Sequence, residues 1–176
     1  KKMLQAKGVV GIWPANAVGD DIQVYDADGS GKQLGTFHTL RQQEEREDAT
    51  YYAMSDFIAP KASGKTDYIG AFAVSAGFGC EDVCAELRRQ NDDYKGIMME
   101  AVADRLAEAS AELLHYKMRT ELWGYAPDEK LDDEDMLKTQ YTGIRPAPGY
   151  PTQPDHTEKH FMWKLLDAEK ATGIQL

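Results

Sequence analysis

The feature that most constrains the fold of this 176-residue chain is a long stretch without proline, Asp92–Trp123. Proline breaks a helix interior because it lacks a backbone N–H and clashes with the preceding turn. Its absence here permits one continuous helix. Apolar residues recur in the stretch at the three- and four-residue spacing of a single helical face. They are Met98, Val102, Leu106, Ala109 and Leu113. The pattern predicts a long helix whose apolar stripe is buried against a sheet.

Two segments near the N-terminus have the pattern of a β-hairpin. Residues 20–25 alternate polar and apolar side chains, as a half-buried strand does. Residues 26–32 are a turn-forming cluster of Asp, Gly, Ser and Lys. We therefore expect residues 22–25 to pair with residues 34–38.

The order of the elements predicts the fold class. Residues 8–13 form an apolar run of strand length that Pro14 and Asn16 should close, and residues 68–74 are rich in aromatic and β-branched side chains. Strands thus come early and the long helices late, which favours an α+β fold over a doubly wound α/β fold. Pro127 lies beyond the end of the long helix.

Shorter helices are expected elsewhere. The last one should begin at a capping-box-like pair, Asp155 and Glu158, and end at Gly173. An acidic stretch from Asp128 suits a helix N-terminus. The expected short helices cover residues 40–48, 82–90, 128–141 and 155–172.

The charge balance limits the classes of partner. The chain has 20 basic and 30 acidic residues, a formal net charge of −10. This argues against nucleic-acid binding, which needs a basic surface, and permits docking to a basic protein face. No apolar run is long enough to span a membrane. The two cysteines, Cys80 and Cys84, are expected to be plain thiols of a cytoplasmic, reducing environment.

Motifs for metal binding and catalysis are incomplete. His156 and His160 have the spacing of a helical zinc pair, but Thr157 stands where a zinc hydrolase needs glutamate. The calcium-loop-like start at residues 26–31 lacks its acid, because Phe37 occupies the twelfth position. No serine or cysteine lies in a nucleophile motif. We therefore predict no metal site and no catalytic residue.

The segment from Arg145 to Pro151 is the strongest candidate for a binding site. Its prolines fix the backbone, so it can be neither helix interior nor central strand, and we expect a stiff loop that leads into a helix. Binding residues concentrate on loops held by a scaffold, and this one carries Arg145 and Tyr150. The alternative is a rigid surface loop whose arginine caps a neighbouring helix.

These residues resemble the activation domain of cobalamin-dependent methionine synthase. GIRPAPGYP and PDHTEK, at 143–151 and 154–159, are similar to that family's S-adenosylmethionine signature, Arg-x-x-x-Gly-Tyr. The resemblance runs through nearly the whole chain in unbroken order. Further matching segments are GVVGIWPAN at 8–16, DDIQVY at 20–25, LRQQ at 40–43, SDFIAP at 55–60, DYIGAFAV at 67–74, DDYKGIM at 92–98, ADRLAEASAE at 103–112 and WGYAP at 123–127.

The resemblance implies a fold and a function. The fold is α+β, with a curved antiparallel sheet packed by long helices. The family enzyme is a methyltransferase of methionine biosynthesis that methylates homocysteine from 5-methyltetrahydrofolate, and its cobalamin is sometimes oxidised to inactive cob(II)alamin. The activation domain binds S-adenosylmethionine for reductive methylation of that cobalamin. The implied partners are the cobalamin-binding module and a flavodoxin or diflavin reductase. Zinc is implied only for another module of the enzyme.

The resemblance also implies site residues. Arg145, Ala147, Gly149 and Tyr150 correspond to S-adenosylmethionine-binding positions, with Arg145 as a bidentate clamp for the carboxylate. Gly149 would allow close approach of the ligand, the carbonyls of Ala147 and Pro148 would accept hydrogen bonds, and Tyr150 would also face the cobalamin.

Two acids on the long helix complete the implied set. Glu108 corresponds to a ligand-proximal acid. Asp104 corresponds to an acid that faces the cobalamin module and meets the histidine released from cobalt. Both emerge on one helical face because they are four residues apart. A solvated charged face is the alternative interpretation of this pair.

The family's domain extends on both sides of residues 1–176. We therefore expect a single partial domain, truncated at both ends relative to the family and inactive on its own. The rival hypothesis is an acidic docking module for the reductase and the cobalamin domain, without small-molecule binding of its own. A free-standing methyltransferase is weaker, because Asp82 replaces the third glycine of a dinucleotide-type loop.

Overall fold

The computed structural model describes residues 4–45 and 50–176. The chain forms two compact units, each treated separately below. The first unit comprises the chain up to Val9 and Phe72–Gly143, and the second comprises Val10–Ala71 and Ile144–Leu176. Strands and helices are both present, as the predicted α+β class requires.

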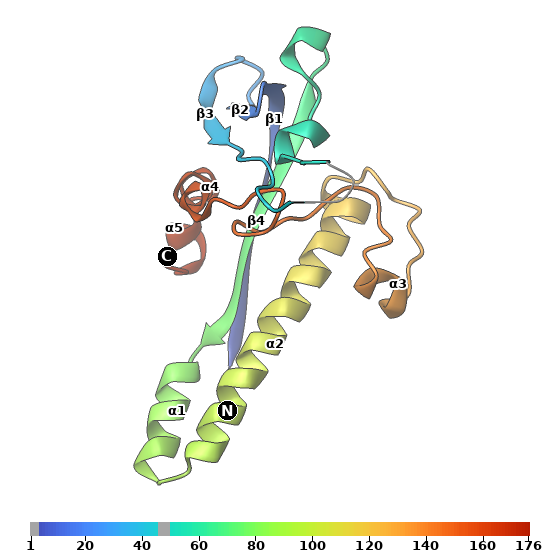
Figure 1. The fold of residues 1–176 in the computed structure, drawn as a ribbon. Helices are drawn as coiled ribbons and strands as arrows, with labels where there is room; N and C mark the ends of the chain where they lie inside the picture. Colours follow the sequence, from blue (N-terminus) through green and yellow to red (C-terminus); the bar gives the residue numbers. More distant parts are fainter. Residues whose placement is uncertain (1–3, 46–49) are drawn as a thin grey trace. The chain divides into compact units, whose positions relative to one another are not determined.

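The sheet has four strands in the order β3-β2-β1-β4 (Figure 1). β2 pairs antiparallel with β3, which confirms the predicted hairpin, and Ile22 lies opposite Phe37 in the register. β1 pairs antiparallel with β2, with Ala15 opposite Val24. The strands are β1 (Gln5–Val18), β2 (Asp21–Tyr25), β3 (Gln33–His38) and β4 (Asp67–Phe78).

The expectation that Pro14 and Asn16 close the first strand is wrong, because β1 continues to Val18. Proline is excluded from a strand mainly where its missing N–H would leave a ladder bond unmade. The ladder between β1 and β2 begins only at Ala15, so Pro14 precedes it on that side. The strand can therefore pass through the proline.

The core of the second unit lies on the inner face of β2 and β3. Ile22 and Val24 alternate with half-buried neighbours and are fully buried. Helix α4 (Lys159–Leu166) covers them, and the ring of Phe161 meets that of Phe37 edge to face at 4.7 Å. Burying one side chain of this size contributes about 1.5–3 kcal/mol. The predicted hairpin thus supplies one side of the core and α4 the other.

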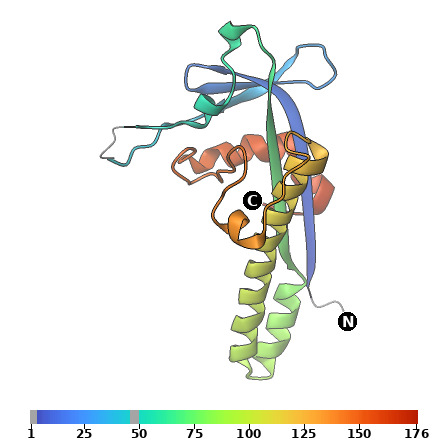
Figure 2. The ribbon, with the colours of Figure 1, turned by 90° about the vertical axis from the view of Figure 1, so that its right-hand side faces the viewer.

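The long helix is confirmed. Helix α2 (Asp93–Lys117) is followed directly by a π-helical turn, η3 (Met118–Leu122). Asp92 caps α2, its side chain accepting from the backbone N–H of Lys95. Helix α1 (Cys80–Arg89) lies beside α2 as the other arm of a helical hairpin (Figures 1 and 2).

The predicted burial of the apolar stripe on α2 is wrong. Met98, Val102 and Leu106 are each more than two-fifths exposed, whereas the buried positions of α2 are Gly96, Ala103 and His115. Small residues let α1 approach closely, and the Cys84 thiol donates to the Gly96 carbonyl across 3.5 Å. Periodicity correctly predicted an apolar face, but the face that packs is the one with the small side chains.

The remaining helices are short. The predicted helix after Asp155 is interrupted at Asp167, which adopts the left-handed conformation with φ of 47°, and it ends at Gly173 as expected. Asp155 caps its start by accepting from the backbone N–H of Thr157. Glu158 is instead buried and accepts from the backbone of His38. The short elements are η1 (Met54–Phe57), η2 (Lys61–Ser63), α3 (Asp133–Leu137), η4 (His156–Glu158) and α5 (Ala168–Thr172).

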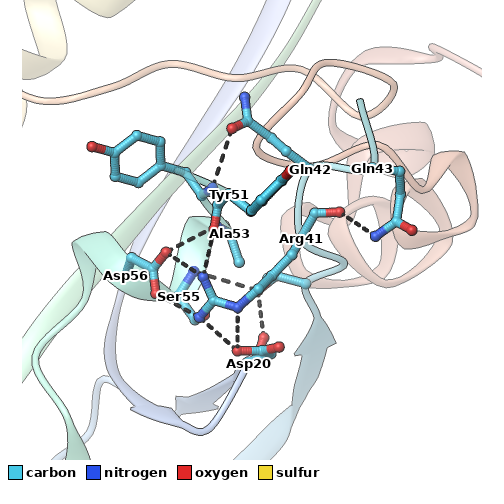
Figure 3. A network of polar contacts seen from close by, with 10 residues as sticks. Asp20, Arg41, Gln42, Gln43, Tyr51, Ala53, Ser55 and Asp56 are labelled. Atoms are coloured by element: carbon cyan, nitrogen blue, oxygen red, sulfur yellow. Dashed lines mark hydrogen bonds and ion pairs between the residues drawn. The ribbon is translucent and has the colours of Figure 1, made fainter. Parts of the chain in front are cut away.

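The helix expected over residues 40–48 does not form in residues 40–45, and its remainder, 46–48, lies outside the described residues. The hydrogen bonds of Arg41 explain why this segment is not helical (Figure 3). Its guanidinium donates to both Asp20 and Asp56 at 2.7 Å and to the Tyr51 carbonyl at 2.8 Å. These long-range bonds outweigh the weak local preference of charged residues for a helix.

None of the helices in the described part of the chain combines the length and the apolar character needed to cross a membrane.

Candidate functional site

The proline-rich loop of the second unit is closed by its own backbone. The N–H of Tyr150 donates to the Ala147 carbonyl at 3.0 Å, and the N–H of Gly149 donates to the Gln153 carbonyl at 2.7 Å. The N–H of Gln153 returns a bond to the Tyr150 carbonyl at 2.8 Å, and the Gln153 side chain is buried. The loop is thus a tight, internally bonded turn, which agrees with the predicted stiffness.

Gly149 is required at its position for two reasons. Its φ of +105° lies in the region that side chains disfavour. In addition, a Cβ built on Gly149 would lie 2.4 Å from Cε1 of His156, far inside van der Waals contact. The sequence predicted that this glycine leaves space for a ligand. On this side of the backbone, the space is filled by the His156 ring.

The other predicted residues of the loop differ in exposure. Tyr150 is 62% exposed, so its ring is available to a partner or ligand. Arg145 is half-buried at the start of the loop. The Ala147 carbonyl was expected to accept a hydrogen bond from the ligand, and in the structure it already accepts the turn bond from Tyr150. Because a carbonyl oxygen has two lone pairs, it retains the capacity for one further donor.

The two predicted acids lie on α2 of the first unit. Asp104 and Glu108 are both exposed and project from one face, as their four-residue spacing predicted. The Asp104 carboxylate is 3.9 Å from the Arg105 guanidinium, a weak surface contact. The structure therefore groups the predicted residues into two sets, Arg145–Tyr150 in one unit and Asp104 with Glu108 in the other.

A buried polar cluster at the end of α2 was not predicted. Arg119 is buried and pairs at 2.6 Å with Glu129, whose side chain is 7% exposed. Burial disfavours the charged guanidinium, but the hydrogen bonds and charge of Glu129 outweigh burial and raise the pKa of Arg119. The ring of Tyr141 covers the guanidinium at 4.3 Å. Through Arg119, this cluster connects the end of the α2 helix to Glu129 and Tyr141 in the segment that follows. These residues are too far apart in sequence to form a recognisable motif.

The two cysteines and the possible metal ligands are the remaining reactive side chains. Cys80 and Cys84 are free cysteines with their sulfur atoms 3.7 Å apart, as predicted for plain thiols. Burial, followed by the neighbouring Cys84, raises the pKa of the Cys80 thiol. Within residues 4–45 and 50–176, no group of three or more His, Cys, Asp or Glu side chains could hold a metal ion.

Comparison with known proteins identifies the family. A solved structure of the MetH reactivation domain bound to AdoHcy superimposes with a TM-score of 0.93 and shares 51% sequence identity. The match covers 99% of this chain and 54% of that one, so this chain spans about half the length of its solved relative. Residues 1–176 match the family described as vitamin B12 dependent methionine synthase, activation domain. The chain therefore belongs to the activation-domain family of vitamin B12-dependent methionine synthase.

Proposed function

We propose that this chain binds S-adenosylmethionine through its proline-rich loop and thereby serves the reactivation of a cobalamin-dependent methionine synthase. The observation that carries the proposal is the solved relative, which holds AdoHcy (S-adenosylhomocysteine) and is 51% identical over 99% of this chain. S-adenosylhomocysteine is what remains of S-adenosylmethionine after loss of its methyl group, so a site for one suits the other.

The residues of the loop fit the chemistry of this ligand. Its amino-acid end carries a carboxylate, which the planar guanidinium of Arg145 can bind through two parallel hydrogen bonds. The second lone pair of the Ala147 carbonyl can accept a hydrogen bond from the ammonium or adenine group. The bonded turn holds these groups in place before the ligand arrives, which reduces the entropy lost on binding.

Glu108 is proposed as a second contact to the ligand. Its exposed carboxylate suits either the ammonium or the sulfonium charge, because both are cationic. Asp104, on the same helical face, is proposed to face the cobalamin-binding module. There a carboxylate would stabilise the protonated form of an imidazole.

The cobalamin belongs to a neighbouring module in this proposal, and it supplies the cobalt centre that accepts a methyl group. The role of this chain is to hold the methyl donor and to present Tyr150, whose ring is 62% exposed. The proposed partners are therefore the cobalamin-binding module and a flavodoxin or diflavin reductase.

Isothermal titration with S-adenosylhomocysteine tests the proposal in the longest natural form of the protein that contains these residues. Arg145→Lys keeps the charge but loses the second parallel bond, so affinity should fall about tenfold, as expected for loss of a charged hydrogen bond. Lys130→Arg, a swap of the same two residue types outside the loop, is the control. An unchanged affinity in Arg145→Lys would remove this residue from the site.

A second candidate function is docking without ligand binding. The net charge of −10 favours it, because an acidic surface attracts a basic face of a partner protein. Reductase binding that weakens steeply with salt, together with no heat of binding for S-adenosylhomocysteine, would support this alternative.

A further inference from the structure

We infer that His156 is a positioning residue of the proposed S-adenosylmethionine site: its imidazole ring lies against Gly149 and sets the course of the Gly149–Tyr150 backbone. The inference rests on the proposed function. His156 lies outside the Arg-x-x-x-Gly-Tyr pattern and follows it in the helical turn η4 (His156–Glu158).

The His156 ring lies within the space that a side chain on Gly149 would need. A Cβ on Gly149 would lie 2.4 Å from Cε1, 2.7 Å from Nε2 and 3.3 Å from Nδ1 of His156. These three atoms form one edge of the imidazole, so the ring presents that edge to the α-carbon of Gly149. His156 is nevertheless an exposed residue. The imidazole thus occupies the place that a side chain of residue 149 would take.

Both segments that meet at this contact have hydrogen bonds of their own. On the helix side, Oδ1 of Asp155 accepts from the backbone N–H and the hydroxyl of Thr157, both at 2.8 Å. Glu158, the last residue of the turn, is buried. On the loop side, the bonds between Gly149, Tyr150 and Gln153 close the turn. The ring therefore lies between two segments that are each held by local hydrogen bonds.

This arrangement has a consequence for binding. One side of Gly149 is closed by the imidazole, so a ligand can approach the Gly149–Tyr150 peptide closely only from another side. Removing the ring would let the backbone shift, and small shifts in positioning groups carry large losses in affinity or rate. Packing by a flat ring accounts for the contact, so we assign the role to the shape of the ring and not to its nitrogens.

A double-mutant cycle tests the inference. The variants are His156→Ala, Gly149→Ala and the combination of both, with S-adenosylhomocysteine affinity and thermal midpoint measured for each. Each single change should weaken binding. The two losses should be less than additive, by about threefold or more, because the alanine at 149 no longer meets the ring once His156 is gone.

Matched controls separate this effect from general strain. Gly64 also has a positive φ, of 69°, but a Cβ there would meet nothing within 4 Å. Gly64→Ala therefore reports the cost of a left-handed residue that meets no steric clash, and His160→Ala reports loss of an exposed histidine on the next turn. Neither should change affinity. His156→Phe keeps a flat ring, so it should retain affinity and should remain incompatible with Gly149→Ala.

The possible outcomes are distinct. If the parent protein binds no S-adenosylhomocysteine, the proposed function fails and the role of His156 fails with it. If the parent binds and His156→Ala stays within about twofold of it, or if the two losses are additive, only the inference about His156 is overturned. Should His156→Ala fail to fold, weakened binding by His156→Phe would likewise overturn it.

Discussion

The guanidinium of Arg119 donates from Nη1 to Nδ1 of His115 across 2.7 Å, in the buried cluster at the end of α2. Arginine is always protonated and has no acceptor, so the histidine must accept. His115 is therefore neutral, with its proton on Nε2. On its other side Arg119 donates to both carboxylate oxygens of Glu129. One cation thus fixes both the tautomer of a histidine and the position of a carboxylate.

This arrangement predicts a large cost for removing the cation. Arg119→Ala leaves the carboxylate of Glu129 buried without its partner, and breaking a buried pair in this way costs about 3–5 kcal/mol. The matched control is Arg88→Ala, whose partner Glu100 is exposed, and exposed pairs contribute at most about 1 kcal/mol. Urea unfolding monitored by circular dichroism measures both. Equal losses in the two variants would contradict a special role for the cluster.

The parts of the fold that were predictable depend on local pattern. The β2–β3 hairpin followed from alternation at Ile22 and Val24 and from the turn cluster between the strands. The length of α2 followed from the absence of proline. The face of α2 that packs could not be predicted in this way. Its buried residues Gly96 and Ala103 are too small to stand out in a hydrophobic pattern, and they pack because they allow close approach. Arg41 likewise holds its segment in a non-helical course through partners distant in sequence.

The candidate site also contains residues that the sequence could predict and one that it could not. Arg145 and Tyr150 could be selected from the sequence, because a proline-stiffened loop with those residue types is unusual and the family resemblance reinforced it. His156 could be seen only as half of an incomplete zinc pair. Its contact with Gly149 arises from the three-dimensional course of the turn, which no spacing rule encodes. The binding roles of Arg145 and Tyr150, like those of Glu108 and Asp104, remain predictions.

The exposed stripe on α2 predicts a contrast between neighbouring positions. Val102 is 47% exposed and Ala103 is 8% exposed. In the 176-residue chain, Val102→Ser should cost less than about 1 kcal/mol, because it removes little buried surface. Ala103→Leu should cost about 1–3 kcal/mol, because a larger side chain would overpack this buried position. Chemical denaturation checks both, and a larger loss at Val102 would mean that the stripe is buried after all.

Gly35 is predicted to be intolerant of even one extra methyl group. A Cβ there would lie 2.3 Å from Cε2 of Phe161, whose ring packs on Phe37 in the core. Gly35→Ala should therefore destabilise the second unit by about 1–3 kcal/mol and lower the thermal midpoint. Gly77→Ala is the control, because a Cβ there has only ordinary contact, 3.7 Å from Oγ of Ser75. A neutral Gly35→Ala would show that α4 can move away from the sheet.

Glu158 predicts a pH dependence of defined sign. Burial is the main cause that raises the pKa of its carboxyl, opposed by the His38 backbone bond and the His38 charge and reinforced by Asp155 and Asp21. The folded protein therefore keeps the Glu158 proton to a higher pH than the unfolded chain does. Ionisation of Glu158 then lowers the free energy of unfolding as pH rises above about 4.5. Glu158→Gln cannot ionise, so its stability relative to the parent should increase between pH 4 and pH 7. Urea titrations across that range measure the difference, and a gap that shrinks with pH would contradict the assigned direction.

Glu108 and Asp104 lie on one helical face but have different proposed roles, Glu108 in ligand binding and Asp104 in contact with the cobalamin-binding module. Substituting each in turn tests the two roles separately. If Glu108 binds the cationic part of S-adenosylmethionine, Glu108→Gln should weaken affinity about tenfold, the cost of one charge-assisted hydrogen bond. Asp104→Asn should leave that affinity unchanged, because its proposed partner is the cobalamin-binding module. Both side chains are exposed, so neither change should alter the thermal midpoint. Calorimetric titration with S-adenosylmethionine distinguishes the two, and equal losses would mean that the carboxylates act only through their shared negative charge.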